Sequence, residues 1–95
     1  MEGSQTPERR RVHYGGHVQG VGFRLTATSV AGRHDVTGYV RNLADGRVEM
    51  VAEGRSGELD RFLADVAAAM DWAIADVKVE RLPATGEFSR FRVRH

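Results

Sequence analysis

The chain contains no cysteine, so it has neither a disulfide framework nor thiolate chemistry. It also has no large excess of charge, because 14 lysines and arginines stand against 13 aspartates and glutamates, a formal net charge of +1 at pH 7. This balance provides no overall field that would recruit nucleic acid or an anionic membrane. Any site for an anion must therefore be local.

Long apolar runs are missing as well. No run approaches the roughly 20 residues needed to cross a bilayer, and the N-terminal sequence MEGSQTPE lacks the apolar core of a signal peptide. We therefore expect a cytoplasmic protein that contacts no membrane. The 95 residues, 41% of them hydrophobic, suffice for one core but not for two. The expected organisation is a disordered polar tail over residues 1–8 and a single domain over residues 9–95.

The first half of the chain changes from one hydrophobic period to another. Apolar residues at every second position over residues 12–18 predict a strand with one buried face. The helical stripe that follows predicts a helix ending around residues 32–35, and its members are Phe23, Ala27, Val30 and Ala31. The run of arginines over residues 9–11, just before the strand, is interpreted as a solvated edge, to which we assign no function.

The second half continues with a hairpin, a helix and further strands. Strands are expected at residues 36–40, 48–52, 77–79 and 91–93. The turn signal Asp45-Gly46 joins the first two into a hairpin, and Ser56 is a candidate N-cap for a second amphipathic helix. The order β, α, β, β, α, β with an additional terminal strand predicts an α/β (α+β) sandwich of the ferredoxin-like type, with one antiparallel-rich sheet and both helices on one face.

The stretch HVQGVGFR, residues 17–24, joins the first expected strand to the first expected helix. A helix N-terminus leaves N–H groups without partners, and Gly20 and Gly22 allow neighbouring amides to turn toward one point, which attracts an anion. Arg24 would lie in the first helical turn, where the helix dipole disfavours a cation, and a bound anion would remove that conflict. On local physics alone, a tight connection with a solvated arginine is an equally good interpretation.

Two segments resemble the signatures of the acylphosphatase family. Residues 16–24, GHVQGVGFR, match G-x-V-Q-G-V-x-F-R, and residues 38–48, GYVRNLADGRV, followed by Gly54, match the second signature. The resemblance extends over nearly all of residues 9–95, with departures at Tyr14, where the family usually has an aliphatic residue, and at Gly15, where it often has a hydroxyl residue. The resemblance implies that Arg24 and Asn42 are catalytic. It also implies that phosphate is bound by Arg24 and by the backbone of Gly16, His17, Val18, Gln19, Gly20 and Val21.

The resemblance implies hydrolysis of an acyl phosphate to a carboxylate and inorganic phosphate. A leaving carboxylate has a pKa of about 4, so it departs as an anion without a general acid. Arg24 and the loop amides would offset charge on the phosphoryl oxygens, and Asn42 would orient the attacking water. The expected partners are a small-molecule acyl phosphate and the phosphate product, and the expected state is a monomer.

Neither a cofactor nor a metal ion is expected. His13 and His17 are the only close pair of histidines, and four residues along a strand span about 13 Å at roughly 3.3 Å each, too far to share one ion. No other cluster of histidine, aspartate and glutamate has the spacing of metal ligands. The two histidines are interpreted as surface or strand-edge residues.

Two functions of other classes stay open. An RNA-binding module of the RRM type has the same order of elements, and residues 19–26, QGVGFRLT, have a faint likeness to its octapeptide. That octapeptide lies on an inner strand and supplies aromatic rings, whereas this segment precedes the first expected helix and has Val21 and Thr26 where rings are needed. The other alternative is a catalytically idle anion-binding domain, since acylphosphatase-like segments also occur inside larger maturation proteins. The presence of both Arg24 and Asn42 favours the enzyme.

Overall fold

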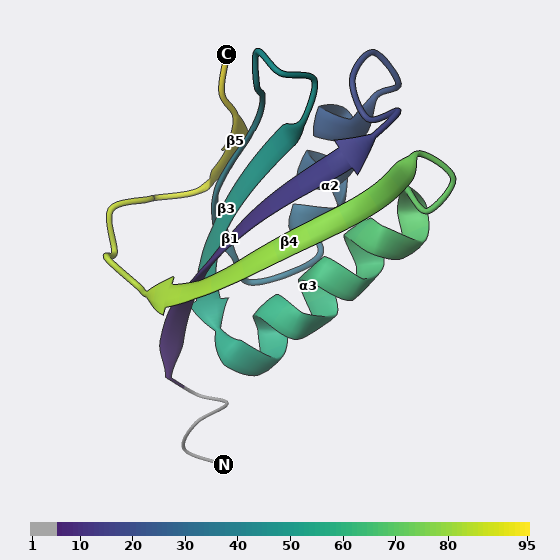
Figure 1. The fold of residues 1–95 in the computed structure, drawn as a ribbon. Helices are drawn as coiled ribbons and strands as arrows, with labels where there is room; N and C mark the ends of the chain where they lie inside the picture. The colour runs from purple at the N-terminus through teal and green to yellow at the C-terminus, as the bar shows by residue number, and fades with distance from the viewer. Residues whose placement is uncertain (1–5) are drawn as a thin grey trace.

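The computed structural model describes residues 6–95, and Figure 1 shows how their strands and helices follow one another. The elements are β1 (Pro7–Gly16), α2 (Phe23–Ala31), β2 (Thr37–Asn42), β3 (Val48–Arg55), α3 (Ser56–Ala69), β4 (Ile74–Pro83) and β5 (Phe91–Val93). This is the predicted order of elements, including the additional terminal strand. Neither α2 nor α3 is long and apolar enough to cross a membrane.

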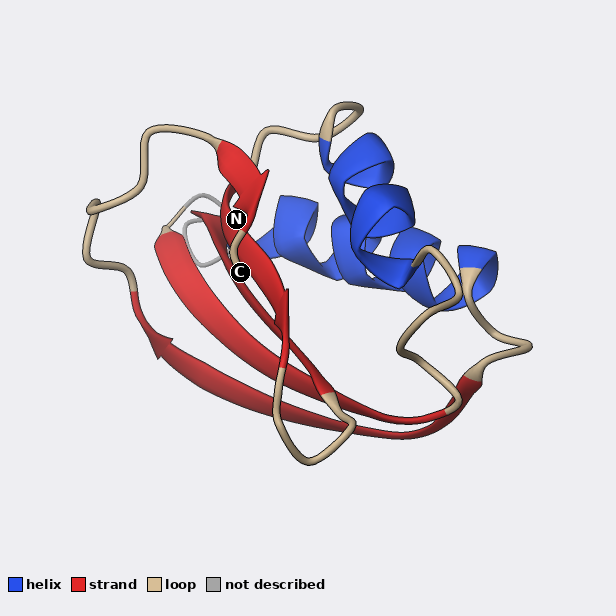
Figure 2. Cartoon of the chain, turned by 90° about the horizontal axis from the view of Figure 1, so that it is seen from above, coloured by secondary structure: helices blue, strands red, loops and turns tan. Residues whose placement is uncertain are grey.

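The strands form one five-stranded sheet in the order β4-β1-β3-β2-β5. All neighbours are antiparallel except β2 and β5, which are parallel. Both helices cover the same face of the sheet, and the other face is left without a helix (Figure 2). The predicted ferredoxin-like sandwich is confirmed, with β1, β3 and β2 in the interior of the sheet and β4 and β5 at its edges.

The core lies between the helices and the covered face of the sheet. Every residue of the predicted stripe on α2 is buried, from Phe23 to Ala31. The sheet side of the core is built from alternate residues of the interior strands: Val12 and Tyr14 from β1, Val48, Met50 and Ala52 from β3, and Val40 from β2. A stripe with helical period therefore packs on a face with period 2, as the sequence pattern predicts.

The start of the domain differs from the expectation. β1 begins at Pro7, and the backbone of Glu8 pairs with Gly54 and Pro83, so residues 7 and 8 belong to the sheet rather than to a tail. Residues 1–5 of the expected tail lie outside the described residues. The extra residues are ordered because strands on both sides of β1 extend far enough to pair with them.

The prediction that the arginine run is a solvated edge is wrong. β1 lies between β4 and β3, and its successive side chains point to opposite faces of the sheet. Arg10 enters the helix side, where it is only 4% exposed and donates to the carboxylate of Asp60 at 2.8 Å. Arg9 points to the opposite face and pairs with Glu53 at 2.7 Å.

Two further boundaries need correction. Ser56 is the first residue of α3 rather than its N-cap, a position that Arg55 occupies in an extended conformation. β4 extends from Ile74 to Pro83, well beyond the predicted residues 77–79. Because β4 is an edge strand, it accommodates a proline that would interrupt an interior strand.

The two departures from the family pattern, Tyr14 and Gly15, are accommodated by packing. The ring of Tyr14 is buried against Phe23, with ring centroids 4.8 Å apart. A side chain at residue 15 would meet the carboxylate of Asp76, since an added Cβ would lie 2.3 Å from Asp76 Oδ1. The end of β1 is therefore packed on both faces immediately before the glycine-bearing loop begins.

Candidate active site

The loop over residues 17–22 connects β1 to α2 and turns on two glycines. Gly20 and Gly22 have φ values of 76° and 81°, in the left-handed region that favours glycine. Gly22 is the N-cap of α2, and its carbonyl accepts the first helical hydrogen bond from Thr26 N–H at 2.9 Å. The loop thus leads directly into the positive end of the helix dipole.

The side chain of Gln19 fastens this loop to the turn between β2 and β3. Its amide nitrogen donates to the carbonyl oxygens of Leu43 at 2.7 Å and Arg47 at 2.9 Å. The same turn is closed by Leu43 N–H, which donates to the Arg47 carbonyl at 2.8 Å. Two segments that are more than 20 residues apart in sequence are therefore held in a fixed relation.

Arg24 and Asn42 come together at this junction. A hollow of about 120 Å³ is lined by both residues, together with Val18, Gly20, Gly22, Phe23 and Leu25. Arg24 lies in the first turn of α2, and Asn42 is the last residue of β2. The fold thus brings the candidate residues of the two family-like segments to one small, open site.

The charge of Arg24 is not neutralised by the described part of the chain. No carboxylate of residues 6–95 lies within ion-pair distance of it, and the first turn of α2 contains no acidic residue. Its Nη1 lies 3.5 Å from Nδ1 of His95. Arg24 is a half-buried residue, and its guanidinium at the positive end of a helix dipole creates a local potential that favours an anion.

The other residues of the expected cradle occupy different places. Val18 is buried, and Val21 is partly buried against the core. Gly16 and His17 are exposed at the base of the loop, where His17 N–H already donates to the Ala73 carbonyl at 2.9 Å. Gln19 is engaged by the β2–β3 turn. Of the expected set, Val18, Gly20 and Arg24 line the hollow with Asn42, whereas Gly16, His17, Gln19 and Val21 are not part of its lining.

Sequence reasoning missed two features of the site. The first is Leu25, which lines the hollow and is 74% exposed. The sequence did contain a signal for it, because Leu25 is an apolar residue that lies outside the buried stripe of α2. The second is the anchoring role of the Gln19 side chain, which only the folded chain reveals, because its acceptors are backbone carbonyls.

The described residues contain no group of three or more histidine, cysteine, aspartate or glutamate side chains arranged to hold a metal ion. His13 instead contacts Glu49, with Nε2 and Oε2 3.2 Å apart, on the face of the sheet without helices. His17 is exposed at the loop. These two histidines thus lie in separate environments.

Comparisons with known proteins point to one family. The family model for Acylphosphatase matches residues 10–93. The acylphosphatase of Rubrobacter xylanophilus is 42% identical over 95 residues, which cover 99% of this chain and 86% of that protein. The acylphosphatase of Methylococcus capsulatus is 42% identical over 87 residues, covering 88% and 95%. The crystal structure of acylphosphatase from Bacillus subtilis matches with a TM-score of 0.85 and 31% identity, and the match covers 93% of this chain and 99% of that one.

Proposed function

The chain belongs to the acylphosphatase family, and from this premise we propose that it hydrolyses acyl phosphates in the hollow between α2 and the end of β2. The observation that carries the proposal is the meeting of Arg24 and Asn42 in that hollow, beside a loop with two left-handed glycines. Arg24 has no carboxylate partner among residues 6–95, so its charge is available to a substrate. The products are a carboxylate and inorganic phosphate.

Arg24 and the loop amides bind the phosphoryl group. A guanidinium donates two parallel hydrogen bonds to phosphate oxygens, and the N–H groups between Val18 and Gly22 supplement it at the helix N-terminus. These donors stabilise the negative charge on the equatorial oxygens during transfer. Because the N–H of His17 is bonded to the Ala73 carbonyl, His17 shapes the base of the loop instead of binding the phosphate with its amide.

Asn42 orients the nucleophile. Its side-chain amide holds a water in line with the bond between phosphorus and the acyl oxygen. The water oxygen forms a new bond to phosphorus, the bond to the acyl oxygen breaks, and the carboxylate leaves with the bonding electron pair. The water loses a proton to solvent and becomes a hydroxyl of the phosphate. Gln19 supports this geometry by tying the loop to the turn that follows Asn42.

The proposed reaction uses neither a metal ion nor a cofactor, because the leaving group needs no protonation and Arg24 supplies the compensating charge. We further propose that the protein acts as a cytoplasmic monomer on a small acyl phosphate. The RNA-binding alternative is disfavoured by the position of residues 19–26, which lie in a loop and a helix instead of on an inner strand.

The proposed function is tested by comparing the rates at which the wild-type protein hydrolyses two compounds in the presence of a chelator. Benzoyl phosphate releases a carboxylate, whereas phenyl phosphate releases a phenol whose pKa is near 10. We expect turnover of benzoyl phosphate to be faster by about two decades or more. Complete loss of activity in chelator, with recovery in Mg²⁺, contradicts the metal-free mechanism. Comparable rates on both substrates mean that a general acid is present.

The same experiment separates the enzyme from an idle anion-binding domain. Such a domain binds inorganic phosphate but turns over neither substrate. A titration with single-stranded RNA, monitored by the fluorescence of Trp72, provides the control for the nucleic-acid alternative, and we expect no saturable binding.

A further inference from the structure

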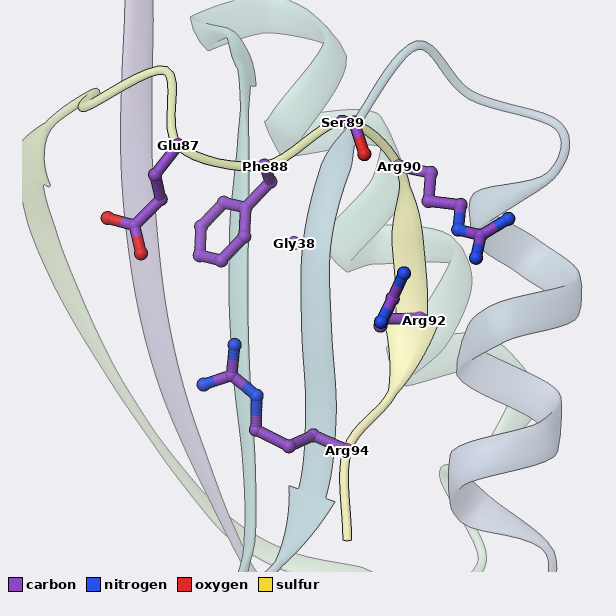
Figure 3. A pocket seen from close by; sticks show the side chains of 7 residues that line it. All are labelled: Gly38, Glu87, Phe88, Ser89, Arg90, Arg92 and Arg94. Atoms are coloured by element: carbon purple, nitrogen blue, oxygen red, sulfur yellow. The ribbon is translucent and has the colours of Figure 1, made fainter.

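A second hollow lies on the face of the sheet that the helices do not cover. It has a volume of about 200 Å³, lies over β2 and β5, and shares no lining residue with the hollow at Arg24. Figure 3 shows Phe88 and the guanidinium of Arg94 in front of the sheet, with Arg92 beside them, whereas the side chain of Arg90 points outward. This site is independent of the proposed catalytic reaction.

Three arginines line the hollow, Arg90, Arg92 and Arg94, and none has a carboxylate partner among residues 6–95; Arg92 and Arg94 are the two at the sheet face. Glu87 also lines the hollow, but its carboxylate accepts hydrogen bonds from the Arg9 guanidinium and the Thr85 hydroxyl, both at 2.8 Å. Arg9 also pairs with Glu53 at 2.7 Å, so it offsets the charge of Glu87 only in part, but the three arginines of the lining outnumber this one carboxylate and give the hollow a net positive potential.

Arg94 is held in one orientation by stacking. Its guanidinium carbon lies 3.8 Å from the centroid of the Tyr39 ring, and its backbone N–H donates to the Val40 carbonyl at 2.9 Å. Tyr39 is itself fixed, because its hydroxyl donates to the nearly buried carboxylate of Glu49 at 3.1 Å. A guanidinium stacked flat on a ring keeps its N–H edge available, so little conformational entropy is lost when an anion binds.

The backbone beside the hollow is equally constrained. Arg92 pairs with Tyr39 in the parallel register of β5 and β2, and Gly38 N–H donates to the Arg90 carbonyl at 3.0 Å. Arg92 and Arg94 have the same parity, so both point to the uncovered face, while Phe91 and Val93 pack against the core. The two guanidinium groups thus project from β5 and from the residue just after it toward one space.

We infer that this hollow binds a small phosphorylated compound, whose dianionic phosphate is held by Arg92 and Arg94 and whose organic part contacts Phe88. Arginine forks match phosphate oxygens in geometry and charge. The volume is below the roughly 300–1,000 Å³ of sites for drug-sized ligands, so the ligand is small. Stacking of a nucleic-acid base on the Tyr39 ring is disfavoured, because the Arg94 guanidinium covers that ring.

The test is a titration of the isotope-labelled protein at low ionic strength, followed by the backbone amide resonances in NMR spectra. The probe is phenyl phosphate, which combines a ring with a phosphate dianion, and benzoate is the singly charged control. We expect saturable shifts at residues 88–94 with a dissociation constant in about the millimolar range, and binding of benzoate at least about tenfold weaker. The amides of residues 18–24 report separately on the proposed catalytic site in the same spectra.

Matched variants distinguish specific binding by Arg92 and Arg94 from nonspecific attraction by the positive charge of the protein. Replacing both cations, Arg92→Gln with Arg94→Gln, is expected to weaken the shifts at residues 88–94 at least about tenfold. The control pair Arg33→Gln with Arg55→Gln removes the same charge from exposed arginines that also lack a carboxylate partner among residues 6–95, and is expected to change the affinity less than about twofold. If the double variant at β5 unfolds, Arg94→Lys replaces it, with an expected loss of several-fold because the charge stays but the stacked fork is lost.

Three results overturn the inference. Shifts at residues 18–24 without shifts at residues 88–94 leave the proposed function standing and remove the second site. An equal loss in the control pair reduces the effect to nonspecific electrostatics. Tighter binding of a single-stranded RNA oligonucleotide than of phenyl phosphate at residues 88–94 identifies the face as a nucleic-acid surface instead.

Discussion

The carboxylates of Glu49 and Glu53 on the uncovered face of the sheet and the arginine in the hollow at the end of β2 differ in whether their charges are paired. On the uncovered face, the carboxylates of Glu49 and Glu53 are 8% and 5% exposed, and both are fully engaged. Glu53 accepts hydrogen bonds from Arg9 Nε at 2.7 Å and from the N–H groups of Thr85 and Gly86, each at 2.9 Å. At the end of β2, by contrast, Arg24 faces solvent with no carboxylate partner among the described residues.

This difference separates groups that hold the fold from groups that are available to a ligand. Within the described residues, every buried polar side-chain atom has a hydrogen-bond partner, as expected where an unpaired buried group would be costly. Burial alone would raise the pKa of Glu53, but the N–H groups of Thr85 and Gly86 and the Arg9 guanidinium outweigh it and hold the pKa below its ordinary value. A saturated network of this kind stabilises the sheet and has no capacity left for substrate.

The largest effect is expected from removing the unpaired cation. Arg24→Gln should lower turnover of benzoyl phosphate by two to three decades or more, the order found for one strong electrostatic donor. The same variant should also bind inorganic phosphate more weakly, because in the proposed mechanism the guanidinium contacts the phosphoryl oxygens both in the ground state and in the transition state. Steady-state kinetics and a phosphate titration measure both effects.

The matched control for this change is Arg33→Gln, which removes an exposed arginine just after α2. Arg24→Lys should recover little, since an ammonium does not reproduce the planar fork. Unaltered phosphate affinity in Arg24→Gln would place the arginine outside the cradle and remove the contrast between the two regions.

The second prediction separates positioning of water from binding of phosphate within the hollow. Asn42→Ala should keep the fold and most of the phosphate affinity but lose about two to three decades of single-turnover rate, because the nucleophile is no longer oriented. Asn42→Asp should be no better, since it adds negative charge beside an anionic phosphoryl group. Near-normal turnover excludes Asn42 from the mechanism, and loss of folding reduces it to a strand-end residue.

The third prediction tests the hydrogen-bonded network around Glu53. Glu53→Gln should lower the free energy of unfolding by about 1–3 kcal/mol. The largely buried Arg9 loses its charged acceptor, and the new side-chain NH₂ group points at N–H donors that the carboxylate accepted from. Phosphate affinity should be unchanged. Glu80→Gln, which breaks the exposed pair with Arg11 on the same face, is the control and should cost at most about 1 kcal/mol. Urea unfolding compares the two, and equal losses would show that burial has no influence on this face.

The fourth prediction concerns the residue that joins loop and turn. Gln19→Ala removes both hydrogen bonds to the Leu43 and Arg47 carbonyls, and we expect kcat to fall about tenfold while stability falls by about 1 kcal/mol. Gln19→Glu should not rescue activity, because a carboxylate cannot donate to carbonyl oxygens. A rise in KM with unchanged kcat would assign Gln19 to substrate binding rather than to positioning.

The smallest effect is a pH dependence on the helix side. The Arg61 guanidinium, the Asp35 N–H and the His34 ring lower the pKa of Glu58 to about 2. Because the folded pKa lies below the unfolded one, the contribution of Glu58 to stability is present above about pH 4.3 and is lost as the pH falls toward about 2. The difference between the urea midpoints of the wild-type protein and Glu58→Gln should shrink from pH 7 through pH 4 to pH 2.5, and a constant difference contradicts the assignment.

The order of elements could be predicted because it depends on local periodicity. The stripe from Phe23 to Ala31 and the alternation along β1, β2 and β3 reflect which side of each segment is apolar, and that information is contained in neighbouring residues. Arg24 and Asn42 could likewise be selected before folding, since each lies in a short segment that resembles an acylphosphatase signature. Their roles are still proposals, but their meeting in one hollow follows from the fold.

The partners of polar side chains could not be predicted, because they are decided by strand order and register. Arg10 is buried since β1 lies between two strands and α3 brings Asp60 to it, which no local feature of three consecutive arginines indicates. Gln19 reaches a turn more than 20 residues away, and Arg94 stacks on Tyr39 only because β5 pairs in parallel with β2. Local sequence determined which faces are apolar and which residue types flank the loop. Only the tertiary structure decided which charges are neutralised and which stay available, because ion pairs and hydrogen bonds of this kind form between residues that are distant in the chain.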